Sequence, residues 1–307
     1  MTKPTLLILA AGLGSRYGSL KQIDSIGPSG ERIIDYSVYD AIKAGFGKIV
    51  YVVRESFEEE FKEIILDTLP KEIETDYVCQ ELNFIPDDIE YSKERKKPWG
   101  TGHAMMVAAS KINEPFAVIN ADDFYGAESF QIAAEYLTNE KNNEDEYALI
   151  SFRLRKTLSE FGSVSRGICE VNTANYMTSI VEVKEIKIVN DGFVFKDDKG
   201  IWRNLTGDEN VSMNMFAFKP TIFEKFEKQF RRFLIENNSD MKSEFYIPTT
   251  INSMIQNGEA QVKILESKAA WFGLTYAEDK PIARDKMKKL IDINIYPEKL
   301  WENFKID

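Results

Sequence analysis

The sequence predicts an α/β fold, in which a mainly parallel but mixed sheet is flanked by helices. Three observations lead to this prediction: apolar runs of strand length, segments of helical spacing between them, and closely spaced strands in the second half. Apolar runs without alternation are typical of strands that helices cover on both faces. The 307 residues, 43% apolar and 29% charged, have the balance of an ordinary globular protein, which argues against disorder.

The first half of the chain alternates strand and helix. The apolar run 5–11 stops at Gly12, and a helix over 33–44 is followed by a strand over 48–53. Such strand, helix, strand units pair their strands in parallel. The later elements of this half are a helix over 57–69, a strand over 74–80, a helix from 101 to 110, a strand over 116–120 and a helix over 130–137.

The second half is richer in strands, which is typical of sheet extension and hairpins around a pocket. We expect strands at 147–154, 164–171, 180–188, 211–218 and 262–265, and helices at 224–235, 247–255 and 281–291. No Pro/Gly/Ser-rich linker divides the chain. We therefore predict one domain over residues 1–280 and a helical extension over 281–307.

Composition excludes several classes of function. A formal charge of −11, from 39 basic and 50 acidic residues, argues against a nucleic-acid partner. No apolar run reaches the roughly 18 residues of a membrane span, and no signal peptide is evident, so we expect a cytoplasmic protein without a membrane partner. Cys79 and Cys169 are expected as reduced, buried thiols, and His103 is the only histidine.

A glycine-rich loop follows the first predicted strand. Backbone N–H groups at such a place cradle phosphates, and cations at Arg16 and Lys21 would neutralise a triphosphate. The glycine spacing fits neither a dinucleotide-binding motif nor a P-loop, and surface cations around an ordinary turn are the alternative. The candidate phosphate-binding residues are Leu9, Ala10, Ala11, Gly12, Gly14 and Ser15.

This segment resembles the signature of sugar-phosphate nucleotidyltransferases, L-A-A-G-x-G-[ST]-R followed by a lysine. The N-terminal motifs are similar to those of N-acetylglucosamine-1-phosphate uridyltransferases. The resemblance implies a Rossmann-like, GT-A-like nucleotidyltransferase fold with a more β-rich acceptor-binding half, and makes residues 1–280 the catalytic domain. It also implies that Arg16 contacts the departing pyrophosphate and Lys21 contacts phosphate oxygens.

Two further segments resemble the family's nucleobase site. They imply that Gln80, at the end of Tyr77-Val-Cys-Gln80, reads the base together with Gly100 and Thr101 of Gly100-Thr-Gly-His-Ala. His103 follows in the same run, where packing or capping is a more common role for histidine than catalysis. The segment 83–99 between them, which carries Lys93, Arg95, Lys96 and Lys97, is either a mobile lid or a solvated charge run.

An acidic pair follows the buried strand 116–120. Oxygen ligands at such a strand end suit Mg²⁺, and the resemblance makes Asp122 the metal ligand, with Asp123 in a supporting role or as a helix cap. The family's second metal ligand is not in register at Trp271-Phe-Gly-Leu-Thr275. Thr275, Asp279 or water could take its place, or a single protein carboxylate could hold the metal.

The acceptor side resembles the family less closely. Phe161-Gly-Ser-Val implies a sugar contact at Gly162, and Asn214 lies in a strand that would carry it toward the sugar. Glu182 and Lys184, two residues apart on one strand, can share a face, where Glu182 would bind hydroxyls and Lys184 the acceptor phosphate. An exposed ion pair is the alternative. Pro248-Thr replaces the family's Thr-Asp after Glu244-Phe-Tyr-Ile.

The sequence thus predicts a transferase, specifically a Mg²⁺-dependent nucleotidyltransferase of nucleotide sugar biosynthesis. Its partners would be a nucleoside triphosphate (UTP, dTTP or CTP) and a sugar 1-phosphate, with pyrophosphate as the product. Arg16, Lys21, Asp122 and Lys184 are the predicted catalytic residues. A cytidylyltransferase acting on a phosphorylated alcohol or phosphonate and a non-catalytic nucleotide sensor are the alternatives. The sequence leaves the oligomeric state open.

Overall fold

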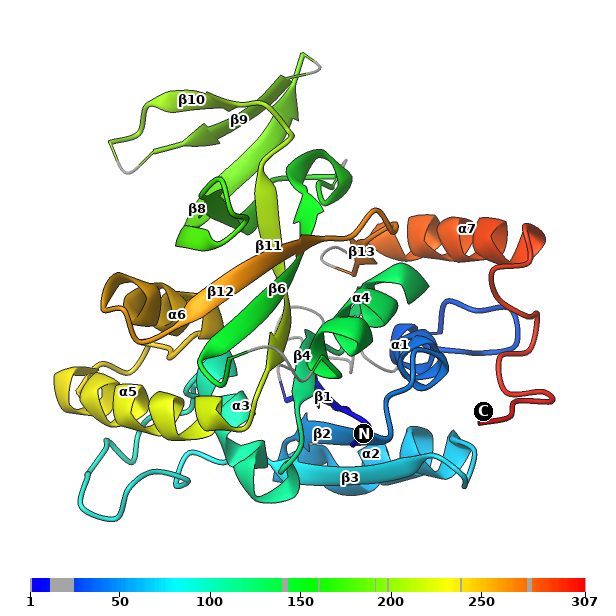
Figure 1. Cartoon of the computed structure of the whole chain (residues 1–307), viewed down its shortest axis with the longest axis horizontal. Coiled ribbons are helices and arrows are strands. Elements are labelled where there is room, and N and C mark those ends of the chain that lie inside the picture. The colour runs from blue at the N-terminus through cyan, green and yellow to red at the C-terminus, as the bar shows by residue number, and fades with distance from the viewer. Residues whose placement is uncertain are drawn as a thin grey trace.

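The structure is a computed structural model, and it describes residues 2–11, 25–139, 143–159, 161–190, 192–197, 199–237, 239–274 and 278–306 (Figure 1). The helices are α1 (Ile33–Lys43), α2 (Glu58–Ile64), α3 (Thr101–Val107), α4 (Ala127–Leu137), α5 (Thr221–Asn237), α6 (Ile247–Gln256) and α7 (Asp279–Asp292). Short 3-10 helices are η2 (Glu55–Phe57), η3 (Leu66–Thr68), η4 (Ala108–Lys111) and η5 (Leu154–Lys156). Across these ranges, no helix has both the length and the apolar character needed to cross a membrane.

The strands form one large mixed sheet and one small one. They are β1 (Thr5–Leu9), β2 (Lys48–Val53), β3 (Glu74–Cys79), β4 (Phe116–Asn120), β5 (Asp123–Phe124), β6 (Glu146–Arg153), β7 (Val164–Val171), β8 (Met177–Val189), β9 (Gly192–Lys196), β10 (Trp202–Leu205), β11 (Asn210–Phe218), β12 (Gln261–Glu266) and β13 (Phe272–Gly273). In the large sheet the order is β10-β9-β8-β7-β11-β4-β1-β2-β3, and β6 pairs with β11 and with β12. The strands β4, β1, β2 and β3 are parallel, whereas β11 runs antiparallel to β4.

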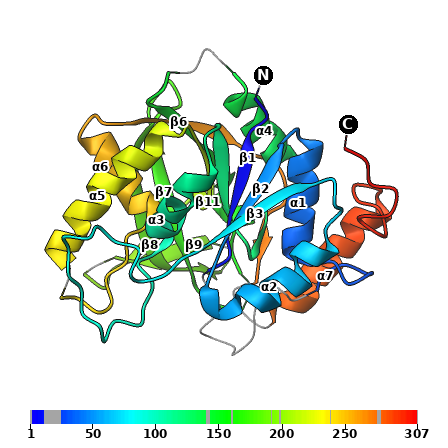
Figure 2. The same ribbon diagram turned by 90° about the horizontal axis from the view of Figure 1, so that it is seen from below.

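Helices cover both faces of the parallel region, because its strands are apolar on both sides. Leu6 and Ile8 of β1 pack in the cluster that includes α1 and α4, while Leu7 and Leu9 pack in the cluster that includes α3, α5 and α6. Figure 2 shows α1 and α2 on one side of β1, β2 and β3, and α3, α5 and α6 on the other. The predicted α/β fold is therefore confirmed, including the β-rich second half.

The C-terminal segment contributes to a third cluster. Met287 of α7, Tyr296 and Leu300 are buried there against Tyr36 of α1 and Phe124 of β5. β5 pairs with β13 in the small sheet. The predicted division at residue 280 stays a prediction, and the cluster joins residues from both sides of it.

Several predicted boundaries were wrong. The helix expected over 57–69 is interrupted after Ile64, since the Ile64 carbonyl accepts hydrogen bonds from the side chains of Arg32 and Thr68. The hairpin of β9 and β10, which projects from the body in Figure 1, was not predicted. Cys169 is buried as expected, but Cys79 is only half-buried.

Candidate functional site

The carboxyl ends of β4, β1, β2 and β3 lie in one row, and each is followed by polar residues. Asp122 follows β4, the glycine-rich loop follows β1, Arg54 follows β2 and Gln80 follows β3. Open α/β sheets place their ligands beyond the carboxyl ends of parallel strands. This row therefore defines the candidate site.

The start of the glycine-rich loop lies against the acidic strand end. Leu9 is in register with Asn120, and Ala121 N–H donates to the Leu9 carbonyl at 3.2 Å. On the other side, Ala10 N–H donates to the Val52 carbonyl at 2.8 Å, and Ala10 and Ala11 are buried. The predicted phosphate-binding residues Gly12, Gly14, Ser15, Arg16 and Lys21 lie outside the described residues.

The two aspartates differ in their surroundings. Asp122 is half-buried, whereas Asp123 is buried and its Oδ2 accepts hydrogen bonds from Asn120 Nδ2 (2.9 Å) and the Tyr125 hydroxyl (3.3 Å). Burial, together with the neighbouring Asp122 charge, raises the pKa of Asp123 well above its usual value. Asp122 is therefore the more accessible of the two carboxylates.

A bulge in β11 brings Asn214 to the same place. The register of β11 against β6 shifts between Ser212 and Phe216, and Asn214 has a left-handed backbone with φ of 59°. Its Nδ2 lies 3.4 Å from Asn120 Oδ1. Asn214 Oδ1 is buried, and no described residue donates a hydrogen bond to it.

The strand expected to carry a second metal ligand does lie beside the acidic pair. Gly273 of β13 is opposite Asp123, and Leu274 N–H approaches the Asp122 carbonyl at 3.4 Å. A Cβ atom on Gly273 would lie 2.4 Å from Asp123 Oδ1, which explains the need for glycine there. Thr275 lies outside the described residues, and Asp279 accepts from Ser159 Oγ at 3.3 Å.

Arg166 of β7 is a site residue that sequence reasoning missed. Its guanidinium is buried, hydrogen-bonded to Thr157, and lies over the Trp271 ring at 4.9 Å. Burial lowers the pKa of Arg166 to about 10, against the raising effect of the Asp123 and Glu182 charges. The residue pattern of β7 did not indicate a functional role for Arg166, because nothing in it distinguishes Arg166 from the other polar residues of the strand.

Two of the acceptor residues predicted from the sequence, Glu182 and Lys184, flank Val183 of β8, which is opposite Arg166 of β7. Glu182 is opposite Gly167 on β8, and although the residue is exposed, partial shielding raises the pKa of its carboxyl, opposed by Arg166 and Lys184. Lys184 is exposed, and Gly162 is half-buried just before β7. Glu182 is thus tied electrostatically to both Arg166 and Lys184.

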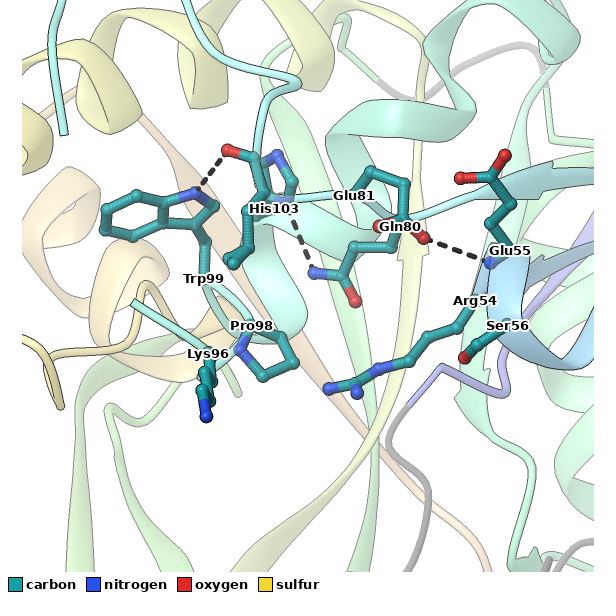
Figure 3. Close-up of a pocket in the computed structure, with 10 residues that line it drawn as sticks. Arg54, Glu55, Ser56, Gln80, Glu81, Lys96, Pro98, Trp99 and His103 are labelled. Carbon is teal, nitrogen blue, oxygen red and sulfur yellow. Dashed lines mark hydrogen bonds between the residues drawn. The ribbon is translucent and has the colours of Figure 1, made fainter. Parts of the chain in front are cut away.

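At the other end of the row, Gln80 lines a cleft of about 390 Å³, a volume in the range of small-molecule sites. The residues around it are Arg54, Glu55, Ser56, Glu81, Leu82, Lys96, Pro98, Trp99 and His103 (Figure 3). Arg54 was not predicted, although its position directly after a buried parallel strand is the signal that would have found it.

Gly100 and Thr101 form the start of α3 beside Gln80. Gly100 has φ of 102°, and a Cβ atom there would lie 2.7 Å from the Phe245 carbonyl oxygen, so only glycine fits. The Thr101 hydroxyl accepts from Ile247 N–H at 3.2 Å. Of the predicted base-binding residues, Gln80 lines the cleft, and Gly100 and Thr101 lie directly behind it, where the Gly100 carbonyl accepts from Gln80 Nε2 at 3.0 Å.

The segment 83–99, expected as a lid or a solvated charge run, contacts the body through Arg95 and Lys97, while Lys93 and Lys96 are exposed. Arg95 is buried, lies 3.7 Å over the Trp99 ring, and donates from Nη1 to the Asp240 carbonyl at 2.8 Å. Lys97 forms an ion pair with Glu244. Both contacts attach this segment to the stretch before α6.

The family model described as "Nucleotidyl transferase" matches residues 6–274 of the chain. No match was found among the curated proteins. The family match covers the whole row of strand ends, from the start of β1 to the end of β13.

Three solved structures share the fold. Inositol-1-phosphate CTP transferase from T. maritima has a TM-score of 0.61 at 14% identity, covering 94% of this chain and 97% of its own. A UDP-glucose pyrophosphorylase complexed with UDP-glucose has a TM-score of 0.61 at 18% identity, covering 94% and 99%. HddC from Yersinia pseudotuberculosis has a TM-score of 0.56 at 16% identity, covering 92% and 99%.

Proposed function

Because the chain belongs to the nucleotidyl transferase family, we propose that it transfers a nucleoside monophosphate from a nucleoside triphosphate to a sugar 1-phosphate, releasing pyrophosphate. The observation that carries this proposal is the contact between Ala121 N–H and the Leu9 carbonyl. Through it, the phosphate loop begins next to the strand end that bears Asp122. One triphosphate can then contact the loop and the carboxylate together. Such a reaction belongs to nucleotide sugar biosynthesis.

The proposed reaction is an in-line substitution at the α-phosphorus. An oxygen of the acceptor phosphate forms the new P–O bond while the bond to the pyrophosphate oxygen breaks. Arg16 and Lys21 would stabilise the charge on the leaving pyrophosphate, and Lys184 would reduce repulsion from the acceptor phosphate. The acceptor phosphate is ionised near neutral pH, so no general base is required.

Mg²⁺ is the cofactor that this site would suit. In the described parts of the chain no three His, Cys, Asp or Glu side chains are grouped to hold a metal ion. Mg²⁺ is commonly held by one or two carboxylates together with substrate phosphates, so Asp122 fits as its protein ligand. The buried, unpaired Oδ1 of Asn214 adds an oxygen to the same polar network. When bound, the ion would supply charge neutralisation at the phosphates.

The acceptor is proposed to lie between β7, β8 and β11. Glu182 would bind its hydroxyls, and Gly162 and Asn214 would contact the sugar. A phosphorylated alcohol is the second candidate acceptor, with CTP as donor. It is favoured by the similarity to a structure named as an inositol-1-phosphate CTP transferase.

A pyrophosphate-release screen tests the proposal, with UTP, dTTP, CTP, ATP and GTP each paired with sugar 1-phosphates and inositol 1-phosphate. We expect turnover with at least one pair in the presence of Mg²⁺. Asp122→Asn and Arg16→Ala should each lower turnover at least about a hundredfold, as expected from losing a few kcal/mol of transition-state stabilisation.

Asp67→Asn is the matched control, because it makes the same chemical change at an exposed position on η3. It should retain the wild-type rate. Wild-type rates in both the Asp122 and the Arg16 variants would refute the assignment of these residues.

A further inference from the structure

A chain of hydrogen bonds runs behind the base cleft, and His103 is at its centre. His103 Nε2 lies 2.7 Å from the Phe84 carbonyl oxygen, and Nδ1 lies 3.1 Å from Gln80 Nε2. Gln80 Nε2 also lies 3.0 Å from the Gly100 carbonyl oxygen. His103 is fully buried, with its ring 5.0 Å from that of Phe230.

The two carbonyl groups at the ends of this hydrogen-bonded series, those of Phe84 and Gly100, determine where its hydrogens lie. The Phe84 carbonyl can only accept, so His103 carries its hydrogen on Nε2 and leaves Nδ1 as an acceptor. The atom of Gln80 that faces both Nδ1 and the Gly100 carbonyl must therefore be the donor. Both hydrogens of the Gln80 amide are used in this way.

The opposite amide orientation is unfavourable for two independent reasons. It would place Gln80 Oε1 against the Gly100 carbonyl oxygen and against the bare Nδ1 of His103, so that acceptors would face acceptors. The observed orientation leaves Oε1 without a donor among the residues that the structure describes. In Figure 3 this oxygen points away from His103, toward the side of the cleft where Arg54 lies.

We infer that His103 is a positioning residue, which locks the Gln80 amide so that Gln80 offers only its carbonyl oxygen to the cleft and can pair only with an N–H group of the nucleobase. This inference rests on the proposed function, because it names what the base site recognises. Uracil and thymine present a ring N3–H, cytosine and adenine an exocyclic amine, and guanine a ring N1–H and an exocyclic amine, so the position of the donor on the base decides which base can pair with the fixed oxygen. The Gln80 carbonyl oxygen would accept a hydrogen bond from one such N–H group of the base, and the Gln80 amide hydrogens would not be available to donate to it.

The surroundings keep His103 neutral, as the lock requires. Burial, together with the charge of Arg95, lowers the pKa of His103 to about 4, against the raising effect of the hydrogen bond to the Phe84 carbonyl. A proton on Nδ1 would face the amide hydrogens of Gln80 and break the chain. Base selection should therefore not change between pH 6 and 9.

Nitrogen NMR of the ¹⁵N-labelled full chain tests the lock without any turnover. His103 is the only histidine, so its two ring nitrogens give the only imidazole signals. We expect the Nε2–H tautomer, with no titration until the pH falls below about 5. An Nδ1–H tautomer, or titration near the ordinary value of 6.5, would overturn the inference.

A matched pair of variants separates positioning from packing. His103→Asn keeps an acceptor close to the place of Nδ1, and His103→Gln keeps a donor close to the place of Nε2 but offers Gln80 no acceptor. We expect His103→Gln to raise KM for the preferred triphosphate at least about tenfold and to narrow the preference among bases, with kcat and the acceptor KM little changed. His103→Asn should retain most of the preference.

Failure of the inference and failure of the proposed function give different results. If the wild-type chain binds triphosphates but releases no pyrophosphate, the proposed function fails, and calorimetric titration of UTP and CTP into the same variants still tests the lock. If wild-type and His103→Gln proteins show the same preference among bases, by turnover or by binding, the inference is wrong. A preference for UTP or dTTP would identify the ring N3–H as the group read, and a preference for CTP the exocyclic amine.

Discussion

Asn214 combines two features that are costly in a folded protein. Its backbone has φ of 59°, and its Oδ1 is buried without a donor from any part of the chain that the structure describes. A left-handed backbone costs a residue with a side chain roughly 1–2 kcal/mol, though asparagine tolerates it better than most. Local strain of this kind is often found at functional sites, which agrees with the proposed contact between Asn214 and the acceptor.

Asn214→Gly and Asn214→Ala separate these two features. Both variants remove the amide, so both should raise KM for the acceptor by about tenfold, the effect of losing roughly 1.4 kcal/mol of binding. Only Ala meets the steric penalty of the positive φ, so its free energy of unfolding should be about 1 kcal/mol below that of the Gly variant. Steady-state kinetics and urea unfolding measure the two effects. An acceptor KM unchanged in both variants would exclude Asn214 from the acceptor site.

At the level of elements, α1 is attached to the C-terminal segment through a buried acid. The Tyr296 hydroxyl donates to Asp40 Oδ2 at 2.6 Å, and both residues are buried. Burial raises the pKa of Asp40 to about 8, while the bond from Tyr296 lowers it. The carboxyl is therefore protonated in the folded chain at pH values where the unfolded chain has lost that proton.

The stability of this attachment should depend on pH. As the pH rises from about 4 to about 8, the unfolded chain releases the Asp40 proton and the folded chain retains it, so the free energy of unfolding falls. Asp40→Asn has no such titrating group, so its free energy of unfolding should not show this fall. The difference between the variant and the wild type should therefore increase by up to about 1.4 kcal/mol per pH unit in this range. Chemical unfolding at several pH values measures the difference. If the free energies of unfolding of the two proteins change with pH in parallel, the raised pKa of Asp40 is contradicted. Tyr296→Phe removes the hydrogen bond that lowers this pKa, so the decline in the free energy of unfolding should extend to higher pH.

At the scale of the whole molecule, the C-terminal segment packs against the small sheet of β5 and β13, which lies next to the candidate site. Met287 is buried in one cluster with Phe124 and Phe272, the residues next to Asp123 and Gly273 in the small sheet. Phe124 and Phe272 stack at 4.5 Å between ring centroids. Residues after position 280 are thus packed against β5, the strand that contains Asp123.

Truncation of Met287 tests whether this packing makes the chain one cooperative unit. Met287→Ala should lower the free energy of unfolding by about 2–5 kcal/mol through loss of buried contacts, and fluorescence and circular dichroism should still follow a single transition. Lys288→Ala, one residue further on an exposed face, should change it by less than about 0.5 kcal/mol. Two separate transitions would show that the C-terminal segment folds independently of the site.

Much of the fold and part of the site follow from local signals. The buried strands 48–53 and 116–120 are apolar runs followed by polar residues, and in a parallel sheet the carboxyl ends of the strands meet at one edge. Asp122, Gln80 and the first residues of the phosphate loop could therefore be expected in one row. The hairpin of β9 and β10 could not, because its short strands lack a strong apolar pattern.

The sequence alone determined which strands end in polar residues and which residue types stand at those ends. Both features depend on only a few neighbouring residues. The tertiary structure decided the rest: that Trp99 lines the same cleft as Gln80, that the charges of Arg166 and Asp123 interact, and that His103 orients Gln80. Each of these depends on contacts between segments far apart in the chain, such as the 3.1 Å approach of Gln80 to His103. Packing selects such partners from many candidates of the same residue type, and no local pattern distinguishes them.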